Sequence, residues 1–137
     1  GCEKWLSVVD EVVGEACTDV SGGVVSLAGD GTVVAMGETS NRGNGSSCGH
    51  VRVYQTDGTT WTQIRADSDG EGAIDFSGRS VSLSGDGTVV AIGADANDGN
   101  GYDSGHVRVY NTDGTTWTQV GADIYGEADD DRSGVSV

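Results

Sequence analysis

The chain has 137 residues, of which 35% are hydrophobic and 21% charged, a composition that indicates a globular protein and not a disordered one. Seven basic against 22 acidic residues give a formal net charge of -15, which repels phosphate backbones and anionic lipid and excludes nucleic acid as an expected partner. No apolar run approaches the roughly 20 residues of a membrane span, so membrane insertion of this segment is not expected either.

Glycine and proline usage predicts the class of structure. The chain has 24 glycines and no proline, and the residues between the glycines are rich in β-branched and aromatic types, as in 88–92 and 106–110. Such a pattern favours short strands joined by tight glycine turns. The predicted fold class is therefore all-β.

A tandem repeat sets the predicted architecture. The segment 25–37 returns at 81–93, and the same shift, from position 25 to position 81, carries 50–54 onto 106–110 without a gap. We divide the chain into the end of a diverged copy (1–24), one repeat (25–80) and a second repeat that continues into the start of the next (81–137). We expect the chain to be a stretch of a longer array.

Each repeat is expected to hold four strands, taken in the second repeat by residues 79–84, 88–93, 106–111 and 115–120. The strand at 88–93 is apolar on both faces and should be the most buried. Gly85-Asp86-Gly87 and Thr112-Asp113-Gly114 predict tight hairpins, which enforce antiparallel pairing. Four antiparallel strands per repeat predict blades of a partial β-propeller, whereas a β-solenoid, the alternative, brings parallel neighbours.

Three motifs resemble the FG-GAP repeat of integrin-α-type propellers: Phe76 to Ser82, Val90 to Ala94, and Gly105 to Tyr110. That repeat has Phe-Gly, then Gly-Ala-Pro, then Gly-x-Val-x-Val-Tyr. Here Ser77 separates the Phe from its Gly, and Asp95 stands in place of the Pro. The resemblance implies a seven-bladed propeller in adhesion or extracellular recognition, of which this chain supplies less than half.

Recurring side chains inside the blades are interpreted as structural. Trp5, Trp61 and Trp117 hold one blade position and are expected to pack between blades, although an aromatic binding shelf is the alternative. His50 and His106 are expected to form hydrogen bonds to a neighbouring loop and not to bind metal.

Two arginines share a strand face with these histidines. Arg52 and Arg108 are expected to pair with acidic residues of a neighbouring blade.

An enzymatic function is not predicted. Gly45-Ser46-Ser47-Cys48-Gly49 fits the G-x-S-x-G pattern, but that motif needs a strand-to-helix turn with His and acid partners. The corresponding segment of the second repeat, 101–105, lacks the central Ser, and no constellation of Ser or Cys with His and an acid recurs.

Acidic residues concentrate in two connections that should emerge on one face of a blade. They are Asp95, Asp98, Asp103, Asp123, Glu127, Asp129, Asp130 and Asp131. A solvated charged rim is one interpretation; a cation site or a docking surface for a basic partner is the other.

Calcium is not expected at the position used by integrin-type blades, because the hairpins 29–31 and 85–87 carry one carboxylate each and the ion needs six to eight oxygens. No other cofactor is expected. The better candidate for Ca²⁺ is the acidic loop of the second repeat, through Asn97, Asp98, Asn100 and Asp103. Affinity there should be weak, on the order of 10⁻⁴–10⁻³ M.

The cysteines and one sequon predict an oxidising compartment. Cys17 and Cys48 fall on the same predicted blade face and form a disulfide candidate, which leaves Cys2 to pair elsewhere. Asn44 begins an Asn-Gly-Ser glycosylation sequon. We expect the protein to be secreted or to reside in an organelle lumen.

Three functional hypotheses follow, from different classes. The first is a non-enzymatic recognition or adhesion propeller that binds a protein or glycan partner through its loop surfaces. The second is a structural repeat or accessory subunit that contacts neighbouring subunits of a larger extracellular or lumenal assembly. The third is an enzyme whose site lies in blades outside this chain.

Overall fold

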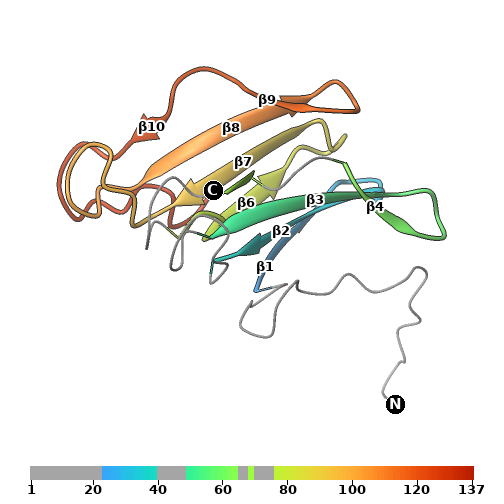
Figure 1. The fold of residues 1–137 in the computed structure, drawn as a ribbon, viewed down its shortest axis with the longest axis horizontal. Coiled ribbons are helices and arrows are strands. Elements are labelled where there is room, and N and C mark those ends of the chain that lie inside the picture. The colour runs from blue at the N-terminus through green and yellow to red at the C-terminus, as the bar shows by residue number, and fades with distance from the viewer. Residues whose placement is uncertain (1–22, 40–48, 65–67, 70–75) are drawn as a thin grey trace, which may run out of the picture.

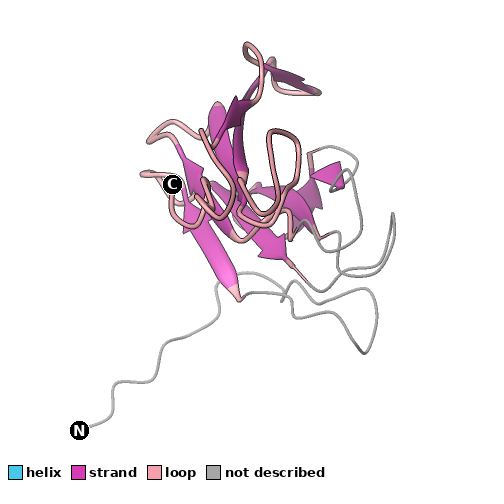
Figure 2. Cartoon of the chain, turned by 90° about the vertical axis from the view of Figure 1, so that its left-hand side faces the viewer, coloured by secondary structure: helices cyan, strands magenta, loops and turns pink. Residues whose placement is uncertain are grey.

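A computed structural model describes residues 23–39, 49–64, 68–69 and 76–137, and this part of the chain is all-β. Its strands form two antiparallel sheets, one from each repeat (Figure 1). Figure 2 shows the same strands and their connecting loops from the side. Among the described residues, no helix is long and apolar enough to cross a membrane.

The first sheet consists of β1 (Val24–Leu27), β2 (Val33–Glu38), β3 (His50–Thr56), β4 (Trp61–Gln63) and β5 (Ser68–Asp69). The second consists of β6 (Ser80–Leu83), β7 (Val89–Ala94), β8 (His106–Thr112), β9 (Trp117–Gln119) and β10 (Ile124–Tyr125). Within each sheet the first three strands are neighbours in chain order, and both short final strands pair with the third.

Strand pairing repeats with the same offset as the sequence. Glu38 lies opposite His50 in the first sheet, and Ala94 opposite His106 in the second. Because every ladder of one sheet has its counterpart in the other at that same offset, the prediction of successive antiparallel blades is confirmed. The diverged copy at 1–24 lies almost wholly outside the described residues and stays a prediction.

The outer strand differs from the prediction of one strand at 115–120. Gln119 lies opposite Tyr110, and Ile124 lies opposite Val107, so five steps along the outer strand face three along β8. The two extra residues form a bulge between β9 and β10. An alternation pattern in the sequence does not reveal such an insertion, because it interrupts the alternation itself.

Short polar side chains hold the predicted hairpins. Asp86 Oδ1 accepts hydrogen bonds from the Ser84 hydroxyl at 2.7 Å, and from the Thr88 hydroxyl at 2.8 Å and backbone N–H at 3.1 Å. These bonds favour the ionised carboxylate and lower the pKa of Asp86 to about 2. The aspartate in the hairpin between the first two strands of each repeat thus stabilises its own turn.

The main core lies between the two sheets. Buried residues of one contiguous cluster come from both: Ala28, Val33, Ala35, Val51 and Val53 from the first repeat, and Val81, Val90, Ile92, Tyr110 and Trp117 from the second. The expected packing of the recurring tryptophan between blades is confirmed at Trp117, while Trp61 is half-buried. The central strands β2 and β7 are the most buried, as expected.

The opposite face of the second sheet is less covered. Its apolar residues Val89, Ala91, Val107 and Val109 are only half-buried. The corresponding face of the first sheet is the one that packs against the second sheet, so the exposed face is the surface where a further blade would stack.

Glycines of the repeat motifs allow the blades to approach. A Cβ at Gly37 would overlap the carbonyl oxygen of Gly78, and one at Gly93 would overlap that of Gly134. In both cases a glycine near the end of a central strand lies against a glycine of the segment that follows the short outer strands. The close backbone contact explains why these positions recur as glycine.

Candidate functional site at the loop end of the blades

Two acidic connections of the second repeat lie side by side, as predicted. The β7–β8 loop (95–105) and the linker after β10 (126–134) gather at the left of Figure 1. Four backbone hydrogen bonds join them: Gly126 N–H to Gly105 O at 3.0 Å, Asp130 N–H to Tyr102 O at 2.8 Å, Arg132 N–H to Asp103 O at 3.0 Å, and Ser133 N–H to Ser104 O at 2.9 Å. Because these bonds tie one backbone to the other, the two segments form one continuous surface.

We define the acidic rim as Asp98, Asp103, Glu127, Asp129, Asp130 and Asp131, all at least partly exposed. Two of them support the loops: Asp98 accepts the Asp103 N–H at 2.7 Å, and Asp131 accepts the N–H groups of Glu127 and Ala128 at 3.0 and 2.9 Å. The carboxylates of Glu127, Asp129 and Asp130 accept no hydrogen bond from the described residues. They are therefore available to a partner.

The prediction was wrong for two members of the acidic set. Asp95 is buried, with 9% exposure, directly after β7. Asp123 turns inward from the bulge, where the Arg108 side chain donates to its two carboxylate oxygens at 2.8 and 2.6 Å. Tertiary packing decided both orientations.

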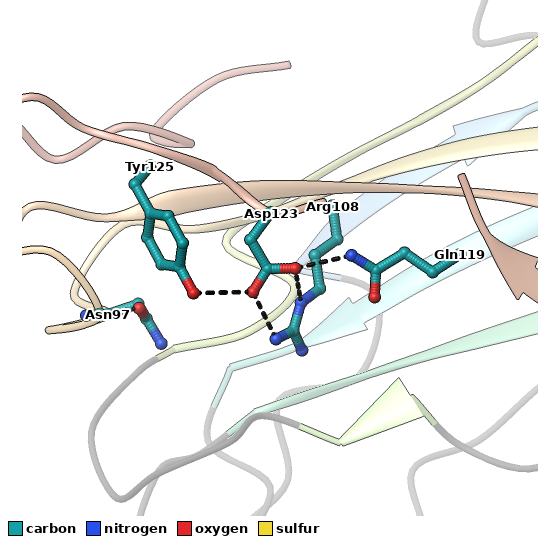
Figure 3. A network of polar contacts seen from close by, with 6 residues as sticks. Asn97, Arg108, Gln119, Asp123 and Tyr125 are labelled. Atoms are coloured by element: carbon teal, nitrogen blue, oxygen red, sulfur yellow. Dashed lines mark hydrogen bonds and ion pairs between the residues drawn. The ribbon is translucent and has the colours of Figure 1, made fainter. Parts of the chain in front are cut away.

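Asp123 is the centre of a polar network drawn in Figure 3. Gln119 Nε2 donates to its Oδ1 at 2.6 Å, and the Tyr125 hydroxyl donates to its Oδ2 at 3.0 Å. The hydrogen bonds from Arg108, together with those from the amide and the phenol, hold the pKa of Asp123 well below its usual range. The network holds the β9–β10 bulge against β8. Because its members form hydrogen bonds with one another, we interpret the network as structural.

The first repeat has a different polar cluster at the corresponding position of its sheet. Glu38 is fully buried, and its carboxylate binds both the His50 ring and the Arg52 guanidinium. Arg52 also donates to the Tyr54 hydroxyl at 2.8 Å.

The expected pairing of the arginines with a neighbouring blade is therefore wrong. Arg52 pairs with the adjacent strand β2, and Arg108 with the bulge of its own sheet. The His50 ring bonds Glu38 on a neighbouring strand, and the ring of His106 meets that of Tyr125 edge-on, with 5.8 Å between the ring centroids.

All four residues proposed for Ca²⁺ already make contacts within or beside the loop, Asp98 through the Asp103 N–H. Asn97 is buried and accepts the Gly99 N–H at 2.8 Å, and the Asn100 side chain donates to the Gly126 carbonyl at 2.9 Å. Asp103 Oδ2 lies 3.7 Å from Arg132 Nη2. Among the described residues, no group of three or more His, Cys, Asp or Glu side chains is arranged to hold a metal. Weak Ca²⁺ binding here stays a prediction.

Other predicted sites lie outside the described residues. These are the disulfide candidate Cys17–Cys48, Cys2 with its expected pairing elsewhere, and the sequon at Asn44. They stay predictions.

One pocket escaped the sequence analysis. It has a volume of about 260 Å³ and lies between the repeats, where its described lining residues are Thr39, Phe76, Arg79 and Asp95. The sequence places Asp95 in the acidic set and at the position of the motif's proline, but not in a pocket. That departure from the repeat pattern was the available signal.

The comparison with protein families agrees with this geometry. Residues 61–110 match the model of the FG-GAP repeat, and the match runs from the outer strand of the first sheet to β8. It contains all three motifs on which the resemblance was based. No curated protein matches the chain. This match supports an FG-GAP-type repeat at residues 61–110 of the chain.

Proposed function

We propose that the chain is a non-enzymatic interaction module that binds a basic protein surface through the acidic rim. Its FG-GAP repeat and blade architecture support a propeller-type protein-interaction domain. This repeat family is typically non-enzymatic, and the rim supplies the chemistry of recognition. Adhesion outside the cell, or recognition in an organelle lumen, is the setting that we propose.

The observation that carries the proposal is the union of two acidic segments into one surface. Glu127, Asp129 and Asp130 are exposed and make no hydrogen bond through their carboxylates to the described residues, so binding a partner would not break an internal contact. Tyr102, with 66% exposure, lies on the β7–β8 loop beside them and adds an aromatic contact. Exposed carboxylates around a tyrosine favour lysine and arginine side chains of a partner.

The test separates the rim from the total charge. One variant carries Glu127→Gln, Asp129→Asn and Asp130→Asn, which raises the net charge by three. A matched control carries Thr60→Lys, Thr62→Lys and Thr118→Lys, exposed positions on and beside the outer strands, which also raises it by three. Asn is suitable at 130 because the backbone there is left-handed, with a φ of 61°.

Binding is measured by fluorescence anisotropy against a panel of lysine- and arginine-rich peptides at about 0.15 M salt. We expect the rim variant to lose roughly tenfold in affinity or more, and the control to lose much less. Equal losses of affinity in the two variants would show that binding depends only on net charge. A panel in which no peptide binds would contradict the proposal.

A structural subunit is the second candidate function. The half-buried apolar face at Val89, Ala91, Val107 and Val109 supports it, since this face lacks the cover that the equivalent face of the first sheet has. Assembly with further blades or neighbouring subunits would cover it.

A further inference from the structure

Asp95 carries a buried carboxylate oxygen with no partner. The side chain is 12% exposed, and its Oδ1 is buried without a hydrogen bond. The other oxygen, Oδ2, lies 3.9 Å from Arg79 Nε, beyond hydrogen-bonding distance. A buried, unsatisfied carboxylate oxygen destabilises a protein unless a bound water or ligand supplies a donor.

Asp95 lines the pocket between the repeats. Thr39 directly follows the central strand of the first blade, and Phe76 and Arg79 belong to the segment that enters the second. The left-handed backbone of Phe76 recurs at Arg132, its counterpart in the next repeat, so that conformation belongs to the linker and not to this pocket. What distinguishes the pocket is the set of side chains.

The charges of the pocket select a class of ligand. Asp95 and the 57% exposed Arg79 carry opposite charges side by side, so a bare cation is repelled by one and an anion by the other. Calcium needs six to eight oxygens, and the described lining offers one carboxylate and one hydroxyl. An apolar ligand would leave Asp95 unsatisfied.

A neutral polyhydroxyl ligand satisfies every described lining group. Its hydroxyls donate to Asp95, accept from Arg79 and exchange hydrogen bonds with Thr39, while its C–H face packs on Phe76. The volume of about 260 Å³ would hold about nine waters at roughly 30 Å³ each, which is the size class of one sugar ring. We infer that this pocket binds a monosaccharide unit, with Asp95 as its main hydrogen-bond acceptor.

This inference is independent of the acidic rim. The pocket lies at a blade junction, and its residues are not members of the rim. A sugar and a basic protein surface would therefore bind through different side chains. Failure of the sugar-binding test would therefore leave the basic-peptide proposal intact, and the reverse also holds.

The experiment is an NMR titration of the ¹⁵N-labelled full chain with D-glucose, D-galactose, D-mannose and N-acetyl-D-glucosamine. We expect at least one of these sugars to cause saturable shifts at the amides of Thr39, Arg79 and Asp95, with a Kd on the order of 1 mM. Absence of such shifts for all four sugars would overturn the inference.

Substitutions assign the role of the carboxylate. Asp95→Leu keeps the size of the side chain and should weaken sugar binding roughly tenfold or more, while the Tm rises because the unsatisfied oxygen is gone. A purely structural Asp95 would instead lower the Tm on substitution. Arg79→Gln, at an exposed position, should weaken binding by a smaller factor and keeps the test valid if Asp95→Leu does not fold.

Asp129→Leu is the control, because this exposed rim residue should leave sugar affinity unchanged while it lowers affinity for the basic peptides. Sugar shifts that survive Asp95→Leu would overturn the inference. So would Ca²⁺ or free lysine that shifts the same amides and loses its effect in Asp95→Leu.

Discussion

The two blades have the same strand pairing, but the described carboxylate that pairs with the arginine comes from a different place in each. His50 and Arg52 on β3 correspond to His106 and Arg108 on β8. In the first blade the carboxylate comes from inside the sheet, at Glu38, and is fully buried. In the second the equivalent position is Ala94, and the carboxylate comes from the bulge, at Asp123.

Among the described residues, both repeats have the arginine, but Glu38, one acidic partner of Arg52, is replaced by Ala94 in the second repeat. Any carboxylate that reaches the guanidinium can stabilise it, whether from a neighbouring strand or from a connection. Asp67, the counterpart of Asp123, lies outside the described residues. Removing a buried counterion destabilises a protein more than removing a partly exposed one. We therefore expect a larger loss of unfolding free energy in the first blade than in the second.

The largest expected effect is the difference in unfolding free energy between substitutions on the covered face of the first sheet and on the open face of the second. Val53 is buried between the blades, whereas its counterpart Val109 is half-buried. Val53→Asp should cost more than about 4 kcal/mol of unfolding free energy, because a charge enters the core. Val109→Asp should cost about 1 kcal/mol and abolish self-association of the chain.

Urea unfolding and sedimentation velocity measure these two outcomes. Self-association is expected for the wild type, since an isolated pair of blades cannot close a propeller. A wild-type chain that is monomeric and unfolds cooperatively would contradict this interpretation of the open face.

The second effect concerns the buried counterion of the first blade. Glu38→Ala should destabilise the chain by about 3–5 kcal/mol, because it removes the carboxylate to which both His50 and Arg52 are bound. Chemical denaturation followed by tryptophan fluorescence measures the loss. A change below about 1 kcal/mol would show that the cluster does not depend on this carboxylate.

The third effect concerns the counterion of the second blade and should be smaller. Asp123→Ala should cost about 1–3 kcal/mol, because Arg108 remains 17% exposed and water can replace part of the interaction. Adding Ala94→Glu, which copies the first blade, should recover part of this loss although Ala94→Glu alone destabilises. A double-mutant cycle with no coupling would contradict the equivalence of the two arrangements.

The same carboxylate predicts a pH dependence. Because the folded pKa of Asp123 is depressed, its stabilisation is present above the unfolded pKa of about 3.9 and is lost as the pH falls towards the folded value. The difference in unfolding free energy between wild type and Asp123→Asn should therefore shrink below about pH 4. A difference that stays constant down to the lowest pH would argue against an ionic contribution.

The smallest effect should be equal in both blades. Asp57 and Asp113 are exposed, and each accepts two backbone N–H groups in its hairpin, which lowers the pKa of Asp57 to about 2. Asp57→Ala and Asp113→Ala should each lower the Tm slightly and by the same amount. Thermal unfolding followed by circular dichroism measures this, and unequal shifts would show that the two hairpins are not equivalent.

The sequence by itself determined the repeat, the all-β class, the hairpins and the burial of the central strands. These follow from local pattern: alternation on the pleat, Asp-Gly turns, and apolar positions that recur when 25–37 is laid on 81–93. It also placed the β7–β8 loop beside the linker, because strand count alone determines the end at which a connection emerges.

Only the tertiary structure decided which side chains meet. The bulge that turns Asp123 inward, the use of Glu38 within its own sheet and the burial of Asp95 in the pocket between repeats all depend on contacts between segments distant in sequence. Local pattern contains no record of such contacts, because a carboxylate in a polar loop has the same sequence context whether it faces water or an arginine. Packing of one sheet on the other selects between these environments.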